Sequence, residues 1–222
     1  MRRAICRREI WAIVPVKRFA DAKQRLSARF SAEFRARLAA AMLEDVVSAL
    51  AKAEHIVGTV LVTAEAGVHN IAKRHAVEIL FRSDDDGINP AVRQGLDHLT
   101  ERGAFGALVV PGDLAFVTPD GLREAAVALG AGNVVVLAPA QRDGGTNLLG
   151  VTLPTTLPLA FGHDSFSLHL RAACDHGFEP IILRGAGLTI DIDLPNDLES
   201  GENLTLGRCT ADLLSSIDAG RA

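Results

Sequence analysis

The chain has 222 residues and a mass of 23.5 kDa, with 48% hydrophobic and 23% charged side chains; this fits one globular domain with a full core and excludes a disordered or low-complexity chain. Its three cysteines are odd in number and far apart, which argues against a disulfide framework or a zinc ribbon and favours the reducing cytoplasm. The net charge of −4 hides an asymmetry, because residues 1–37 hold eleven basic and three acidic side chains, and one basic segment on an acidic body favours a small, highly charged anion over nucleic acid.

Residues 1–9 form a basic extension ahead of the first predicted strand, Ile10 to Val16. An arginine-rich start followed by an apolar run is typical of a secretion signal, but this run is short, contains Pro15 and is closed by Lys17. No apolar run approaches the ~20 residues of a membrane helix. The sequence therefore predicts a cytoplasmic protein that does not act at a membrane.

Strands and helices then alternate along the chain. A long helix begins after the N-cap residue Ser31 and runs to about Lys52, because apolar side chains recur every four residues. The further predicted elements are strands at Ile56 to Thr63, Val77 to Phe81, Ala107 to Val110 and Val134 to Ala138, with helices near Val68 to Arg74, from Pro90 onward, and from Pro119 to about Leu129. This alternation predicts an α/β domain with a mostly parallel, doubly wound, Rossmann-like sheet.

The pattern changes beyond Pro139. A glycine-rich turn is followed by predicted strands at Leu148 to Leu153, Ile181 to Leu183 and Leu188 to Ile192, with a helix from Ser165 to His176. We interpret this part as a small antiparallel elaboration on the same sheet. Residues 10–206 are thus expected to form a single domain, and residues 207–222 a helical or frayed tail.

The residues that follow each strand deserve most weight, because ligands of open α/β sheets bind outside the carboxyl ends of the strands. The first strand is followed by Lys17, Lys23 and Arg25, a cluster suited to phosphates. Neither the G-x-x-x-x-G-K-[ST] nor the G-x-G-x-x-G phosphate motif occurs. From composition alone, a solvated basic loop is an equally good interpretation.

Acidic residues follow the third strand and two later segments. Asp84 and its neighbours before Gly87 suit either a metal or a capped turn, and Asn89 at the helix start could contact a sugar or base edge. Asp113 ends the fourth strand, and a later extended segment brings Asp191 and Asp193 to one face. Two carboxylates from separate strand ends suit Mg²⁺ bound to substrate phosphates, whereas Asp193 could instead cap a helix.

Two glycine-containing turns offer small donors. Thr146 ends the turn that begins at Arg142, and Gly162 precedes a helix that starts at Ser165, where an anion or an ordinary N-cap would fit. His163, His169, Cys174 and His176 lie near this helix, but their spacing matches no zinc pattern.

Six motifs in order resemble one known family. They are Val14-Pro15-Val16-Lys17 with Ala22-Lys23-x-Arg25-Leu26, Asp86-Gly87-Ile88-Asn89, Pro111-Gly112-Asp113-Leu114, Asp143-Gly144-Gly145-Thr146-Asn147, Phe161-Gly162-x-x-Ser165 and Asp191-Ile192-Asp193-Leu194-Pro195. Together they are similar to the 2-phospho-L-lactate guanylyltransferase family of coenzyme F-420 biosynthesis, including its phosphoenolpyruvate and 3-phosphoglycerate variants. The resemblance covers about residues 10–200 and implies a nucleotidyltransferase fold.

The resemblance also implies roles for individual residues. Lys17, Lys23, Arg25 and Asp113 would be catalytic, with GTP bound by Val14, Pro15, Lys17, Asp84, Gly87 and Asn89. Asp113 and Asp193 would hold Mg²⁺, and Thr146, Gly162 and Ser165 would hold the phosphorylated hydroxy acid that accepts GMP. A homodimer is compatible with the family. The alternatives are a nucleotidyltransferase of the same fold with a molybdopterin or sugar-phosphate acceptor, or a non-catalytic GTP-binding protein.

Overall fold

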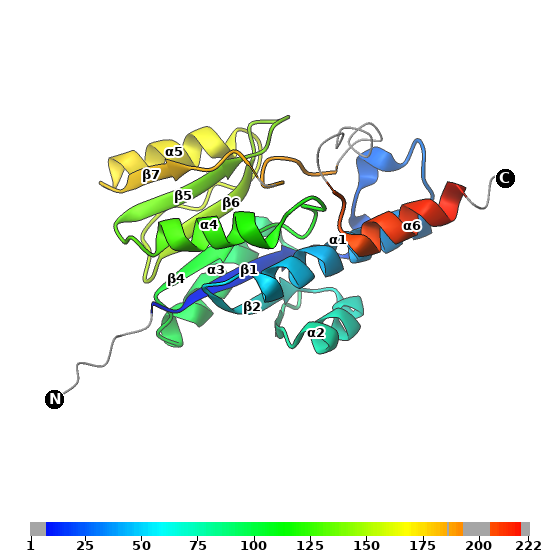
Figure 1. The fold of residues 1–222 in the computed structure, drawn as a ribbon, viewed down its shortest axis with the longest axis horizontal. Helices are drawn as coiled ribbons and strands as arrows, with labels where there is room; N and C mark the ends of the chain where they lie inside the picture. The colour runs from blue at the N-terminus through cyan, green and yellow to red at the C-terminus, as the bar shows by residue number, and fades with distance from the viewer. Residues whose placement is uncertain (1–7, 186, 193–204, 219–222) are drawn as a thin grey trace.

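The computed structural model describes residues 8–185, 187–192 and 205–218, which form one seven-stranded sheet covered by helices on both faces (Figure 1). The strands are β1 (Ile10–Val16), β2 (Ile56–Thr63), β3 (Glu78–Phe81), β4 (Gly106–Val109), β5 (Val134–Pro139), β6 (Thr146–Thr152) and β7 (Glu179–Ile182). The helices are α1 (Ala32–Lys52), α2 (His69–His75), α3 (Ile88–Glu101), α4 (Pro119–Leu129), α5 (Ser165–Asp175) and α6 (Arg208–Asp218).

The strand order in the sheet is β3-β2-β1-β4-β6-β5-β7. Every neighbouring pair is parallel except those made by β6, which runs antiparallel to both β4 and β5. The prediction of a mostly parallel sheet is confirmed, and its antiparallel part is a single strand inserted between two parallel ones. The chain proceeds outward from β1 to β3 and then returns to place β4 on the other side of β1, so a crevice opens between the carboxyl ends of β1 and β4.

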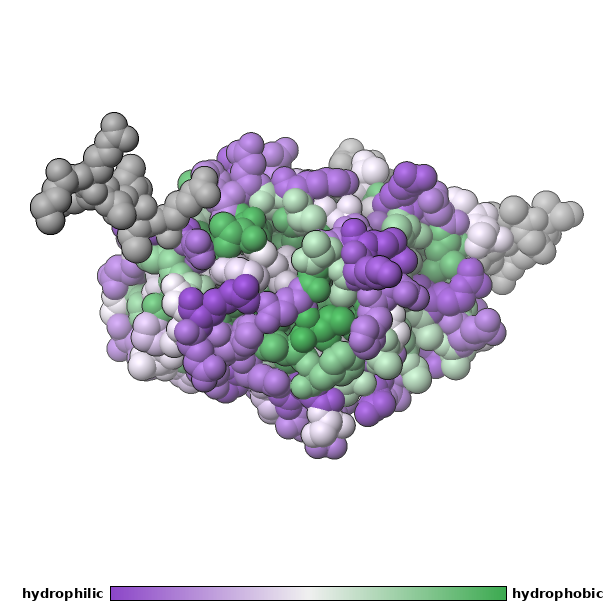
Figure 2. Space-filling view, turned by 90° about the horizontal axis from the view of Figure 1, so that it is seen from below, coloured by the Kyte–Doolittle hydropathy of each residue, from purple (hydrophilic) through white to green (hydrophobic). Residues whose placement is uncertain are grey.

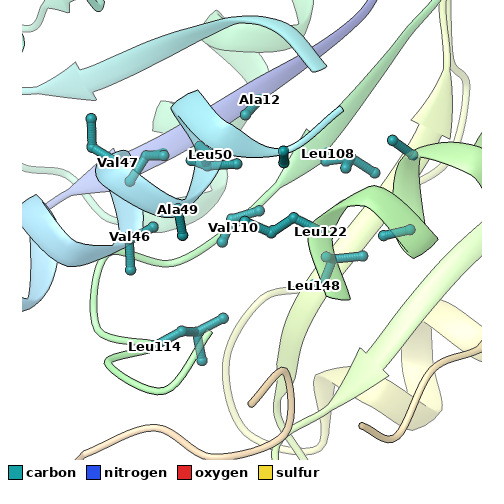
Figure 3. Close-up of a cluster of buried hydrophobic side chains, with 14 of the residues drawn as sticks. Ala12, Val46, Val47, Ala49, Leu50, Leu108, Val110, Leu114, Leu122 and Leu148 are labelled. Carbon is teal, nitrogen blue, oxygen red and sulfur yellow. The ribbon is translucent and has the colours of Figure 1, made fainter. Parts of the chain in front are cut away.

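The continuous apolar run of β1 is explained by burial on both faces. Ala12 packs in the cluster formed with α1 and α4, whereas the neighbouring Ile13 packs in the cluster formed with α3 and α5. Figure 3 shows the first cluster, in which Val46 and Leu50 of α1 and Leu122 of α4 meet above the sheet. The apolar repeat of α1 divides between two clusters: Val46 and Leu50 pack against the sheet, whereas Leu38 and Met42 pack in a separate cluster that includes Phe116.

Several predicted boundaries shift by one or two residues, and two differences concern the loops near the cavity and the start of a helix. The strand expected at Leu188 to Ile192 is wrong: residues 187–189 form a turn, and the Gln141 amide, after β5, donates to the Thr189 carbonyl at 2.9 Å. Gly187 has a φ of 75° and passes against the backbone of Phe116, where no side chain fits. Helix α3 begins before Pro90, because a proline is tolerated throughout the first turn.

The described part of the C-terminal segment is helical and lies along α1 (Figure 1). Asp45 of α1 caps this helix, since its carboxylate accepts the backbone amides of Cys209 and Thr210 at 2.8 Å each. Gly207 lies so close to Asp45 that a larger residue would displace the carboxylate. The start of α6 is thus held by one buried acid.

Figure 2 shows one face of the molecule, where hydrophilic residues surround smaller hydrophobic groups. Across the described residues, no helix is both long enough and apolar enough to cross a membrane.

Candidate functional site

A cavity of about 640 Å³ opens at the carboxyl ends of β1 and β4, where the strand order reverses. Loops from both halves of the sheet converge on it. Among the residues singled out from the sequence, its lining includes Pro15, Lys17, Lys23, Arg25, Gly87, Asp113, Thr146, Gly162 and Ser165. The tertiary structure therefore brings together groups from five separate segments.

Three other predicted site residues, Val14, Asp84 and Asn89, are not part of this lining. Val14 is fully buried in β1, and Asp84 is exposed and accepts a hydrogen bond from the Ser83 hydroxyl at 2.8 Å. Asn89 forms a paired hydrogen bond with the backbone of Phe161: its amide donates to the carbonyl at 3.0 Å, and its oxygen accepts the amide at 2.9 Å. Contacts of these three with a nucleotide stay predictions, and Asp193 lies outside the described residues.

The basic loop after β1 is held by β2 and by the loops that follow β2 and β3. The Thr63 hydroxyl donates to the Val16 carbonyl at 2.8 Å, and Glu65 accepts the Phe19 amide at 2.8 Å. Asp85, from the loop after β3, accepts the Arg18 amide at 3.2 Å. These bonds give a loop rich in positive charge a defined path along the cavity, where Lys17 and Arg25 lie in its lining.

Lys23 and Asp113 form an ion pair inside the cavity, with 2.7 Å between Nζ and Oδ2. The lysine side chain is only 5% exposed, although the residue lies in a polar loop, whereas Asp113 is 34% exposed. Lys23 has a left-handed backbone with φ 53° and ψ 40° immediately before the short helical turn Gln24–Leu26. This conformation is uncommon for a lysine, and it lets the chain direct the ammonium group back into the site.

Oxygen atoms suited to a hard cation lie near this pair. Asp191 and Asn147 line the same cavity as Asp113, and the Asn147 amide donates to Asp191 at 3.5 Å. Within the described ranges, no group of three or more His, Cys, Asp or Glu side chains is arranged to hold a metal. The donor set fits Mg²⁺, which takes few protein ligands and completes its shell with water and substrate oxygens.

A buried hydroxyl network forms another part of the cavity lining. The Ser165 hydroxyl donates to Thr146 Oγ1 at 3.1 Å, and His169 Nδ1 lies 2.9 Å from the same oxygen. His169 Nε2 accepts the Ala160 amide at 2.9 Å, and the histidine is fully buried. Burial lowers the pKa of His169 from 6.5 to about 4, so the ring is neutral near pH 7.

The site roles assigned from the sequence do not include several residues at this site, although Asp143, Asn147 and Phe161 stand in its motifs. Asp85, Asp143, Asn147 and Phe161 line the cavity, and His169 lies behind it. A signal for His169 was present, because it follows Ser165 by four positions and so shares its helix face. The other four could be placed only after the loops were assembled.

The neutral state of His169 predicts a pH dependence of stability. Between pH 6.5 and about pH 4, the His169 ring is protonated in the unfolded chain but neutral in the native protein. The free energy of unfolding should therefore fall as the pH is lowered across this window, by up to about 3 kcal/mol. The contribution is complete above pH 6.5. Urea unfolding of the wild-type protein and of His169→Phe at pH 7.0, 5.5 and 4.5 isolates it, because all other titrating groups are shared. Equal pH slopes for the two proteins would contradict this assignment.

Comparisons with known proteins agree with this architecture. A family model described as "Guanylyl transferase CofC like" matches residues 10–212. The chain is 36% identical to phosphoenolpyruvate guanylyltransferase of Sphaerobacter thermophilus over 189 residues, covering 85% of this chain and 90% of that protein. It is 34% identical to 3-phospho-D-glycerate guanylyltransferase of Phenylobacterium zucineum over 211 residues, covering 93% and 95%.

A solved structure has a similar fold. The crystal structure of a putative nucleotide-diphospho-sugar transferase from Desulfovibrio desulfuricans superposes with a TM-score of 0.73 at 15% identity, covering 95% of each chain. At this level of identity the likeness concerns the fold alone.

Proposed function

The chain belongs to the CofC-like guanylyl transferase family, and from this membership we propose that it transfers GMP from GTP to a small phosphorylated acid and releases pyrophosphate. The candidate acceptors are phosphoenolpyruvate and 3-phosphoglycerate, which the names of its relatives contain, and 2-phospho-L-lactate. The product would enter coenzyme F-420 biosynthesis in the cytoplasm. The observation that carries the proposal is one cavity lined both by a cationic wall, Lys17, Lys23 and Arg25, and by a hydroxyl wall, Thr146 and Ser165.

The cationic wall suits the triphosphate of GTP. Lys17, Lys23 and Arg25 all line it, and they come from one loop that Thr63 of β2 and Glu65 after β2 hold in place. The charge that accumulates on departing pyrophosphate would be neutralised here. Gly87, at the start of α3, has a φ of 109° and leaves space beside the cavity for the nucleoside.

The hydroxyl wall suits the acceptor. Thr146 and Ser165 supply hydroxyls, and Gly162 precedes the start of α5, where backbone amides favour an anion. Neutral donors bind a phosphate or carboxylate less tightly than a cation would, so the product can still dissociate. The two hydroxyls come from different elements, β6 and α5, and lie 3.1 Å apart.

In the proposed reaction, a phosphate oxygen of the acceptor forms a bond to the α-phosphorus of GTP while the bond to the bridging α–β oxygen breaks. No covalent enzyme intermediate is needed, so the chain contributes positioning and charge stabilisation. Asp113 and Asp193 would hold Mg²⁺, which when bound neutralises phosphate charge and orients the reacting groups. Lys23 lies against Asp113 and would keep its ammonium beside the same phosphates.

The test is pyrophosphate release from GTP and Mg²⁺ with each of the three acceptors in parallel, with ATP and CTP as nucleotide controls. We expect release with GTP and with one acceptor well above the other two. Release only with a sugar phosphate or a molybdopterin would move the chain to another acceptor class. GTP binding without release for any acceptor would indicate a non-catalytic binding protein and overturn the proposal.

A further inference from the structure

We propose that His169 is a positioning residue of the acceptor wall: it aims the Thr146 hydroxyl proton into the cavity and at the same time holds the backbone that carries Gly162. The proposal rests on the function proposed above, because it concerns how the same wall recognises its anion. His169 is fully buried and does not line the cavity, so it acts only through these neighbours.

The proton positions follow from the partners of the ring. Nε2 lies 2.9 Å from the Ala160 nitrogen, an N–H that can only donate, so Nε2 accepts. A neutral imidazole then carries its proton on Nδ1, which lies 2.9 Å from Thr146 Oγ1 and donates to it. Burial keeps the pKa of the ring well below neutrality, which preserves this arrangement of one donor and one acceptor.

The Thr146 hydroxyl is consequently left with one direction for its own proton. Its oxygen accepts from His169 and also from the Ser165 hydroxyl at 3.1 Å, which occupies both lone pairs. Thr146 lines the cavity, so the remaining capacity is a donor facing the ligand. A freely rotating hydroxyl could turn either its proton or a lone pair toward the ligand. It would therefore favour an anion less strongly than a hydroxyl whose proton is fixed toward the cavity.

The second function of His169 concerns the segment Ala160 to Gly162. The ring accepts the Ala160 amide, and Phe161 meets it edge-on at 4.9 Å between centroids. On its other side Phe161 is held by the paired hydrogen bond with Asn89. Gly162 follows with a φ of 140°, in a conformation that favours glycine. One side chain therefore sets the separation between the β6 hydroxyl and the amides at the start of α5.

The test combines kinetics with a direct readout of the ring. We expect His169→Phe and Thr146→Val each to raise the acceptor KM about tenfold, consistent with loss of a buried hydrogen-bond arrangement. The acceptor KM of the double variant should also be about tenfold above wild type, because both changes remove the same oriented donor. His169→Asn, whose amide can replace the Nδ1 donor, should restore the KM to within about threefold of wild type. The KM for GTP should stay within about twofold throughout.

His176→Phe, an exposed histidine of the same segment, is the matched control and should leave both KM values unchanged. An effect of about 100-fold in the double variant, or an equal rise in the KM for GTP, would overturn the positioning role. Nitrogen-15 NMR of the histidines at pH 7 reports the ring without turnover: protonation at Nδ1 is expected, and protonation at Nε2 would overturn the proposal even if no acceptor reacts. Lack of turnover in the wild-type protein with the Nδ1 form present would instead count against the proposed function alone.

Discussion

Replacing Asp113 with asparagine is expected to lower kcat by about 100-fold or more, with the fold intact. The change removes one charge and almost no volume, at the carboxyl end of β4 where the carboxylate lines the cavity and binds Lys23 at 2.7 Å. In the proposed function this carboxylate places a cation beside the reacting phosphates, so its loss acts mainly on the transition state. Steady-state kinetics at saturating GTP and acceptor measure kcat, and electron paramagnetic resonance of added Mn²⁺ measures metal binding.

Asp120→Asn is the matched control, because this aspartate has a side chain 89% exposed on α4 and lies outside the cavity lining. It should leave kcat and Mn²⁺ binding unchanged. Urea unfolding of both variants establishes that each is folded. Turnover of Asp113→Asn within about threefold of wild type, with Mn²⁺ still bound, would show that the metal assignment is wrong.

Lys23→Met is expected to lower kcat/KM for GTP by about 100-fold, on the scale of losing one preorganised charge from a desolvated site. Methionine keeps the length and the apolar stem, so the loss reports the ammonium group, whose side chain is 5% exposed. The backbone cost at φ 53° is common to both residues and cancels. Stability should change by less than about 1 kcal/mol, because the partner carboxylate keeps access to water.

The control for this variant is Lys52→Met, at the exposed end of α1. It should leave kcat/KM at the wild-type value. Titration of GTP at fixed acceptor, and of acceptor at fixed GTP, separates the two substrates, and we expect the acceptor KM to change less than threefold. A similar rise in both KM values would place Lys23 in the structural support of the cavity and not on the nucleotide.

Local signals were sufficient for most elements. Ser31 followed by a four-residue apolar repeat predicted α1, and Thr118-Pro119 predicted the start of α4, because both depend on contacts within one turn of helix. The segment from Leu188 to Ile192 has the pattern of a strand, but its apolar residues are buried in two core clusters, Leu188 in the one with α1 and α4 and Ile192 in the one with Phe116, and not by pairing in the sheet. Alternation alone does not distinguish these two kinds of burial.

The candidate site divides in the same way. Position after a strand singled out Lys17, Lys23 and Asp113, because strand ends are where an open sheet exposes polar groups. Glycine-containing turns singled out Thr146 and Ser165. No local pattern could show that Asn89 pairs with the backbone of a residue 72 positions away. This pair of hydrogen bonds depends on the distance between the start of α3 and the segment before α5, and the packing of these helices on the sheet sets that distance.

The sequence by itself determined the alternation of elements, the mostly parallel sheet and the residue types that the chemistry needs. These follow from short-range rules: side-chain periodicity, helix caps, and polar residues at strand ends. Only the tertiary structure decided that Lys23 lies against Asp113, that β6 runs antiparallel inside the sheet, and that His169 stands behind Thr146. Each of these depends on distances between segments far apart in the chain, and such distances are fixed by the packing of the whole core.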